Sequence, residues 1–225
     1  MVVYLEKYNR DYGAELEFEI LKSEIEVQTS LEKLGLLEPR FFKIRDLVGT
    51  PKLREGGSGF KALVKIIVSQ QLSVSAADAI WLRITETMKV EPNVISEACD
   101  FKLKSLGLSR PKIKYLKLLA SENLDFDALS KLGNQDLLSE LIKIKGVGLW
   151  TAQIYAMFGL RRADIFPIGD LALQEAIRLL YELEKRPIER RMIEISDQWK
   201  PYRSVAALIL WDYYNYCKGR KGIST

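Results

Sequence analysis

The sequence predicts an all-α protein. Almost every segment of the 225 residues places apolar side chains at helical spacing, whereas the alternation typical of strands is scarce. With 48% apolar and 28% charged residues, the composition is typical of a soluble, globular chain. The length suffices for a full hydrophobic core, and we expect either one domain or two compact lobes.

The first expected helix begins after Ser23, a residue suited to an N-cap, with a glutamate three residues on. We expect Ile25, Leu31 and Leu34 to be its apolar positions and Gly35 to end it. Residues 1–17 are irregular and stay unassigned.

Residues 50–59 ("TPKLREGGSG") indicate a linker by their proline and glycine content. An apolar helix running to Val68 and a second from Ala76 flank the polar "SQQLSVS". Its serines, Ser73 and Ser75, suit the N-cap of the second helix. The two adjacent glutamines have no such explanation.

Further helices follow along the chain. A turn at residues 107–111 separates a short helix from one rich in lysine. We expect Asn134 to cap a helix that ends at Gly146, a following helix to end at Gly159, and another to open at Asp170 after Pro167. The last runs through "YRSVAALILWDYYNYC".

Missing residue types exclude several chemistries. The chain has no histidine, so serine-histidine triads and histidine-ligated metal sites are excluded. Its cysteines, Cys99 and Cys217, match no redox or metal-binding spacing, and we expect both to be reduced and buried. The formal charge of +4 and the pI near 8.9 favour an anionic partner only weakly.

No apolar run approaches the roughly 20 residues that a membrane span needs. The first residues carry charges early and lack the apolar region of a signal peptide. We therefore expect an intracellular protein without a membrane partner, in the cytoplasm or nucleoid, or in the nucleus of a eukaryote.

The stretch "KIKGVGLWTA" joins two expected helices through Gly146 and Gly148. Such a turn is an ordinary glycine cap, or it presents amide groups at a helix start to an anionic oxygen such as a phosphodiester. Trp150 is a core residue or a wall that stacks on a base. Lysines at 112, 114 and 117 indicate solvated faces, while those at turns, such as Lys145, are also placed to meet phosphates.

Asp170 follows a proline and a glycine in an apolar surround. It is a helix cap, or a partly desolvated carboxylate that stabilises a developing cation or activates a water. Gln70 and Gln71 cap helix ends, or one of them fills the space left in a duplex by an extruded base.

Four stretches together resemble the helix-hairpin-helix (HhH-GPD) superfamily of DNA glycosylases, in its AlkA-like 3-methyladenine DNA glycosylase II branch. They are "IIVSQQLSVSAADAI", "LGLSRPKIKYLKLLA", "LIKIKGVGLWTAQIYAMF" with "DIFPIGDLALQEAI", and "WKPYRSVAALILW". The resemblance implies a two-lobed helical fold with the active site in the cleft between lobes. The central lobe would be 58–165 and the second lobe 18–57 plus 166–225.

The resemblance also implies roles for individual residues. Asp170 would be the catalytic aspartate, and Trp150 and Trp211 would line the base pocket. The hairpin would be 142–153, with a monovalent cation, Na⁺ or K⁺, at the carbonyls of residues 142–148 and no metal or other cofactor in catalysis. The implied DNA-binding residues are Gln70, Gln71, Ser73, Ser109, Lys145, Gly146, Val147 and Gly148.

Three departures refine this resemblance. Bifunctional members with lyase activity carry a lysine where this chain has Trp150, which predicts a monofunctional enzyme that leaves an abasic site. An aromatic residue of the longer type is Ile154 here, so the substrate range is open. The cysteine cluster of the iron-sulfur branch is absent from the sequence.

The expected function is hydrolysis of the N-glycosidic bond of alkylated purines, of the 3-methyladenine and 7-methylguanine type, by a monomer acting on double-stranded DNA. Alkylation at N3 or N7 makes the purine cationic, so the enzyme mainly extrudes the base and stabilises an oxocarbenium-like sugar. Two alternatives are a non-catalytic helix-hairpin-helix DNA-binding module and a glycosylase of the same fold for oxidised or deaminated bases.

Overall fold

The computed structural model describes residues 19–53 and 56–219, so the unassigned residues 1–17 lie outside the described part. The described residues fall into two compact units, one formed by Gly56–Leu160 and the other by residues 19–53 together with 161–219. Within these ranges the secondary structure is helical apart from one isolated β-bridge between Ile20 and Arg162. The predicted all-α class is confirmed.

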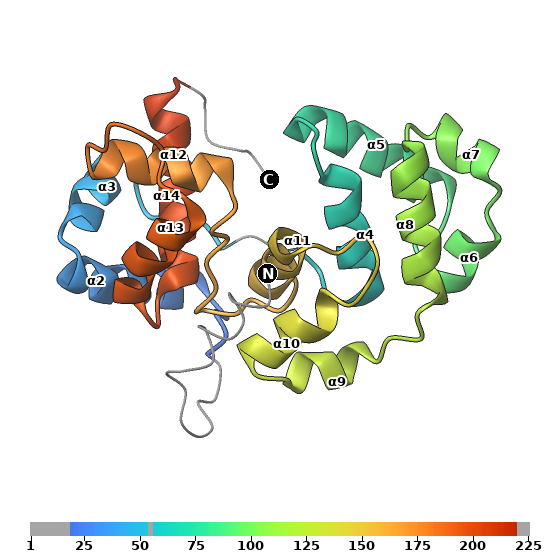
Figure 1. The fold of residues 1–225 in the computed structure, drawn as a ribbon, viewed down its shortest axis with the longest axis horizontal. Helices are drawn as coiled ribbons and strands as arrows, with labels where there is room; N and C mark the ends of the chain where they lie inside the picture. Colours follow the sequence, from blue (N-terminus) through green and yellow to red (C-terminus); the bar gives the residue numbers. More distant parts are fainter. Residues whose placement is uncertain (1–18, 54–55, 220–225) are drawn as a thin grey trace. The chain divides into compact units, whose positions relative to one another are not determined.

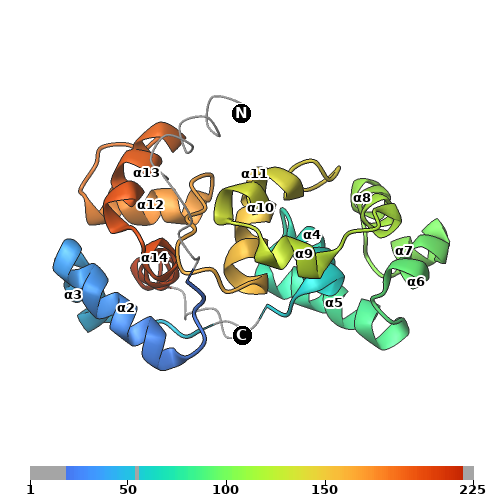
Figure 2. The ribbon, with the colours of Figure 1, turned by 90° about the horizontal axis from the view of Figure 1, so that it is seen from below.

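The discontinuous unit is built around one central helix, α14. Figures 1 and 2 show α2 and α3 on one side of α14 and α12 and α13 on the other. The helices of this unit are α2 (Glu24–Leu37), α3 (Arg40–Val48), α12 (Leu171–Leu180), α13 (Glu189–Ser196), the 3-10 helix η3 (Asp197–Trp199) and α14 (Arg203–Cys217). Residues 203–211 of α14 are all buried, because the helix is covered on every side.

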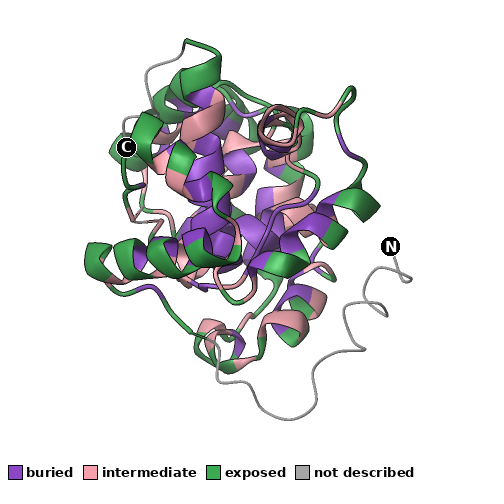
Figure 3. Ribbon diagram, turned by 90° about the vertical axis from the view of Figure 1, so that its left-hand side faces the viewer, coloured by how far each residue is buried: buried purple, intermediate pink, exposed green. Residues whose placement is uncertain are grey.

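A fully buried tryptophan lies in the core of this unit. Trp199 is 0% exposed, and its ring meets the edges of Phe41 and Phe166 at centroid distances of 5.1 and 5.4 Å. In Figure 3, buried residues line the inward sides of the helices and exposed residues their outward sides. Phe166 anchors the segment that leads to Asp170.

The predicted cap of α2 is confirmed, but its predicted end is wrong. Ser23 accepts a hydrogen bond from the backbone N–H of Glu26, whereas the helix runs through Gly35 to Leu37. A Cβ at Gly35 would lie 2.4 Å from the ring of Phe42, so the glycine serves close packing of α3 on α2 rather than a helix stop. Ile25, expected in the core, is 76% exposed.

The segment 161–165, which the sequence assigns to the central lobe, belongs to the discontinuous unit. Its backbone bonds join it there: Ala163 N–H donates to Glu19, and Ser204 N–H donates to Ala163. Arg203, only 1% exposed, binds both carboxylate oxygens of Asp164 at 2.7 and 2.8 Å. These bonds fix the start of the loop that ends in Asp170.

The continuous unit surrounds α4, which packs against α5, α8 and α11. Figure 2 shows α6, α7 and α8 together at one end of the unit. Its helices are α4 (Gly59–Ser69), α5 (Val74–Thr87), α6 (Pro92–Glu97), α7 (Asp100–Ser105), α8 (Arg110–Ser121), α9 (Phe126–Lys131), α10 (Asn134–Leu141), α11 (Leu149–Ile154) and the π-helix η2 (Tyr155–Gly159).

Four local predictions in this unit and one in the other can be compared with the structure. Ser73 caps α5 as predicted, accepting from the N–H of Ala76, and the helical run that follows the hairpin ends at Gly159. Gly133 rather than Asn134 is the N-cap of α10. Both cysteines are free as expected but exposed rather than buried, because Cys99 precedes a short surface helix and Cys217 ends α14.

Candidate functional site

The predicted hairpin is a tight turn between α10 and α11. Gly146 has φ +94°, a left-handed conformation that favours glycine, and a Cβ there would lie 2.4 Å from the Tyr115 ring of α8. Gly148 is the N-cap of α11, with open space where a Cβ would be. Gly146 therefore lets α8 pack against the turn, and Gly148 leaves the outer side of the turn uncovered.

The backbone N–H groups of this turn differ in whether they have a hydrogen-bond acceptor within the protein. Val147 N–H donates to the Ile144 carbonyl at 3.0 Å, and its side chain is buried. For the N–H groups of Gly146 and Gly148, the described residues supply no acceptor. These two amides can thus accommodate an external acceptor, while the Val147 amide stabilises the turn.

The two adjacent glutamines have different environments. Gln70 is half-buried, and its Nε2 donates to Thr151 Oγ1 at 2.8 Å and to the Gly146 carbonyl at 3.4 Å. Gln71 is exposed and has φ +56°. The first glutamine ties the α4–α5 loop to the hairpin, and the second projects from that loop.

Lys112, expected on a solvated face, instead reaches the same loop from α8. Its Nζ donates to the carbonyls of Val68 and Gln70 at 2.7 and 2.8 Å. Burial lowers the pKa of this lysine.

Asp170 is the N-cap of α12, as one of the two sequence interpretations predicts. Its Oδ1 accepts from the N–H groups of Ala172 and Leu173 at 2.9 and 3.0 Å. The same oxygen accepts from Nε1 of Trp211 on α14 at 3.2 Å. Three donors hold one carboxylate oxygen, so the side chain has a fixed orientation at the positive end of a helix.

Buried apolar residues precede Asp170 in the chain, and its indole donor is buried too. The residues that lead to it, Phe166 and Ile168, are 0% and 2% exposed, and Trp211 is 8% exposed. Asp164, six residues earlier, is bound by Arg203 and serves the fold. The structure therefore brings together Asp170 and Trp211 among the predicted site residues of this unit.

The remaining predicted residues lie at the ends of helices in the continuous unit. Trp150 is half-buried in the first turn of α11, and Ser109 is the exposed N-cap of α8. Ser73 is exposed at the start of α5, where its hydroxyl also meets that of Ser75 at 3.3 Å. Lys145 is exposed in the hairpin turn.

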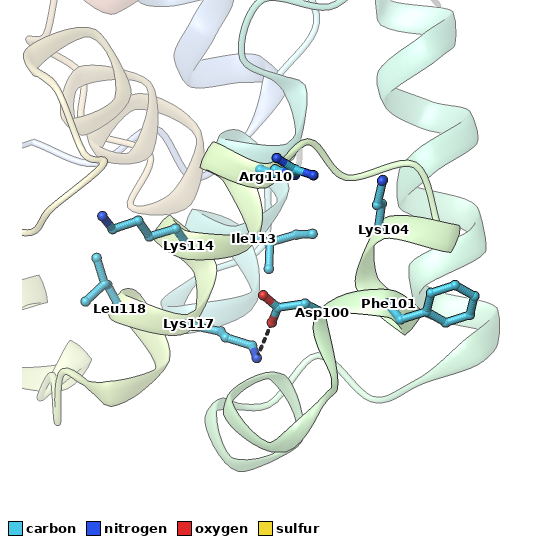
Figure 4. Close-up of a pocket in the computed structure, with 8 residues that line it drawn as sticks. All are labelled: Asp100, Phe101, Lys104, Arg110, Ile113, Lys114, Lys117 and Leu118. Atoms are coloured by element: carbon cyan, nitrogen blue, oxygen red, sulfur yellow. Dashed lines mark hydrogen bonds and ion pairs between the residues drawn. The ribbon is translucent and has the colours of Figure 1, made fainter.

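A hollow of about 640 Å³ lies between α7 and α8, and none of the predicted site residues lines it. Figure 4 shows its basic side chains, with Asp100 bound to Lys117. Its lining is Asp100, Phe101, Lys104, Arg110, Ile113, Lys114, Lys117 and Leu118. Since its only carboxylate is paired and exposed, this hollow is a poor candidate for the chemistry predicted for Asp170.

Two residues that hold the α4–α5 loop were not among the predicted site residues. Thr151 receives the Gln70 amide, and it is one of two buried polar residues of α11, 2% exposed. Lys112 has no distinguishing local signal, because the carbonyls that it binds are over 40 residues away in sequence.

Within residues 19–53 and 56–219, no cluster of three acidic or cysteine side chains could hold a metal ion. In the same part of the chain, no helix combines the length and apolarity needed to cross a membrane.

The open glycine amides of the continuous unit suit a phosphate, and the capped aspartate of the discontinuous unit suits a developing cation, so each feature is compatible with a nucleic-acid repair enzyme. Comparison with known proteins agrees. Residues 64–201 match the HhH-GPD superfamily of base excision DNA repair proteins. The chain belongs to this superfamily, which confirms the resemblance noted in the sequence.

Relatives cover most of the chain. DNA-3-methyladenine glycosylase 1 of Schizosaccharomyces pombe is 30% identical over 203 residues, which are 83% of this chain and 89% of the relative. A Bacillus subtilis relative is 32% identical over 176 residues, but the match spans only 61% of its length. The solved S. pombe 3-methyladenine DNA glycosylase in complex with abasic DNA matches with a TM-score of 0.74 and 27% identity, covering 81% of this chain and 95% of that one.

Proposed function

We propose that this protein is a DNA glycosylase that hydrolyses the N-glycosidic bond of alkylated purines, of the 3-methyladenine and 7-methylguanine type, in double-stranded DNA. The observation that carries the proposal is the single carboxylate of Asp170, fixed by three donors. The superfamily and the names of the relatives support the same reaction class.

The chemistry needs little beyond that carboxylate. A purine methylated at N3 or N7 carries positive charge and leaves as a neutral base when its bond to C1′ breaks. Asp170 supplies the counter-charge for the oxocarbenium-like sugar, and a water oxygen then bonds to C1′ and releases a proton.

DNA is held by the hairpin in this proposal. The N–H groups of Gly146 and Gly148 donate to phosphate oxygens, Lys145 adds a positive charge, and Ser109 adds a contact at the second turn. Trp150 and Trp211 supply indole faces, which attract a cationic base more strongly than a neutral one.

Gln71 rather than Gln70 is the wedge that replaces the extruded base. Its side chain is exposed on a short loop, whereas the Gln70 amide is engaged with Thr151. A group that enters a base stack has to project from the protein without breaking its own internal bonds.

The enzyme is monofunctional and leaves an abasic site. The residue that follows Gly148 by two positions is Trp150, whose indole cannot form a Schiff base with the sugar, so the strand is not cleaved. The protein acts as a monomer.

A monovalent cation fits the turn carbonyls of residues 142–148 in part. Three of these carbonyls already accept bonds inside the protein, Ile144 from Val147, Gly146 from Gln70 and Gly148 from Ala152, and each carbonyl oxygen has a second lone pair. Such an ion would hold a phosphate near the turn and takes no part in bond cleavage.

The test is base release from duplex oligonucleotides carrying 3-methyladenine, 7-methylguanine, 1,N6-ethenoadenine, hypoxanthine or 8-oxoguanine. We expect release of the two methylated purines, intact strands until alkali is added, and no covalent adduct with borohydride. DNA binding without release of any base would favour the binding module, and release restricted to hypoxanthine or 8-oxoguanine would favour the other glycosylase class.

A further inference from the structure

The loop that carries the two glutamines is a strained turn. Gln70 has φ −53° and ψ 132°, Gln71 has φ +56°, and Leu72 N–H donates to the Ser69 carbonyl at 3.3 Å. These values describe a type II β-turn with Gln71 at the third position, where glycine or asparagine is usual. A glutamine there is in a conformation that side chains other than glycine or asparagine rarely adopt, so the surrounding contacts have to hold it.

Lys112 holds the peptide group on which this turn depends. The Gln70 carbonyl, which accepts from Lys112 Nζ at 2.8 Å, belongs to the same planar peptide unit as the Gln71 N–H. Fixing that carbonyl fixes the rotation of the plane and with it the left-handed conformation of Gln71. A flipped peptide would lose this charge-assisted bond.

The same ammonium group also completes helix α4. The last turn of α4 contains no basic residue, and its C-terminal carbonyls carry partial negative charge. Lys112 donates to one of them, Val68, at 2.7 Å. A single side chain of α8 thus joins the end of α4 to the middle of the turn.

A second contact fixes the other side of the loop. The Gln70 side chain binds Thr151 and the Gly146 carbonyl, and Tyr115 of α8 packs on Gly146. The turn is therefore held between α8 and the hairpin, and Gln71 is the residue that projects from it.

We propose that Lys112 is a positioning residue for base extrusion, which holds the 69–72 turn in the conformation that presents Gln71 to the DNA. This inference rests on the proposed glycosylase function. Lys112 touches neither the base nor the sugar in this account, so it affects the step that opens the base pair rather than bond cleavage.

The test compares single-turnover release of the same alkylated purine from two duplexes, one with its pairing base opposite and one with an abasic site opposite. Lys112→Met keeps the aliphatic stem and removes both hydrogen bonds. We expect release about tenfold slower from the paired duplex and within about twofold of wild type from the unpaired one, because an unpaired base is easier to extrude. Lys114→Met, an exposed lysine on the same helix, should leave both rates unchanged.

Equal slowing on both duplexes, or no slowing on either, would overturn the inference while leaving the glycosylase function intact. Absence of release by the wild-type protein from both duplexes would overturn the proposed function itself. If Lys112→Met does not fold, as judged by its thermal transition, Lys112→Gln is tested in the same way, since its amide is too short to reach both carbonyls. Gln71→Gly provides a second check: it should raise Tm by relieving the strained conformation, yet slow release only from the paired duplex.

Discussion

Replacing Asp170 with asparagine separates its two roles. Asparagine and aspartate are equally good N-caps, so the bonds from Ala172 and Leu173 to Oδ1 should persist in Asp170→Asn. Loss of the charge at the helix start should lower the free energy of unfolding by about 0.3–1 kcal/mol, and the hydrogen bond from Trp211 should become weaker. For a chain of this size, 1 kcal/mol shifts Tm by about 2–4 °C.

The catalytic effect should be far larger than the structural one. Without its counter-charge the oxocarbenium-like sugar loses its main stabilisation, and we expect single-turnover release to fall by at least about 100-fold. Asp170→Ala is the matched variant. It should lose the same activity, and its free energy of unfolding should fall by a further ~1 kcal/mol because the capping bonds disappear as well.

The assay pairs base release with affinity for the same duplex, measured by fluorescence anisotropy, and with the thermal transition of each variant. We expect affinity within about threefold of wild type for Asp170→Asn. Release by Asp170→Asn at the wild-type rate would show that the carboxylate is only a helix cap. A Tm loss for Asp170→Asn as large as that of Asp170→Ala would refute the capping argument instead.

Three further predictions concern the glycine turn, the indole donor and an acidic group. Gly146→Ala should lower Tm strongly, because a Cβ would lie 2.4 Å from a ring at a φ of +94°, whereas Gly148→Ala, with open space, should keep Tm within about 2 °C. Trp211→Phe should slow release about tenfold, since the Nε1–H donor to the carboxylate and part of the indole face are lost; an unchanged rate would contradict this. The hydrogen bond from Arg178 lowers the pKa of Glu175 in the folded state, so this pair stabilises the protein above the ordinary pKa of 4.5 and loses that effect as the pH falls. Below that pH, Tm should therefore fall less steeply with pH for Glu175→Gln than for wild type. Parallel plots of Tm against pH for the two proteins would contradict a stabilising role for this pair.

Most of the helical fold could be predicted, because helix caps and apolar spacing are local properties. The caps at Ser23 and Ser73 and the apolar positions Leu31 and Leu34 are confirmed. The helix stop predicted at Gly35 is wrong because a tertiary contact explains this glycine. The ring of Phe42, seven residues later on α3, packs where a Cβ of residue 35 would lie. The same limit applies to the two cysteines, whose exposure depends on what packs nearby.

The site was harder to predict where two neighbours differ in role. Sequence gives Gln70 and Gln71 the same side chain and almost the same position. Their difference arises from one backbone angle, which turns one side chain toward the hairpin and leaves the other exposed. Lys112 supplies the contact behind that difference from a helix more than 40 residues away in sequence, so no local pattern could indicate it.

For Asp170, the two sequence interpretations are not alternatives. A carboxylate on a loop would rotate freely, and in an apolar surround it would lack donors for its charge. The helix start of α12 supplies two N–H donors and a favourable dipole, and Trp211 supplies a third donor from α14. The cap is therefore the means by which this chain, which has no histidine, fixes the direction of one carboxylate. The capping bonds of Asp170 are for this reason compatible with the catalytic role that we propose for it.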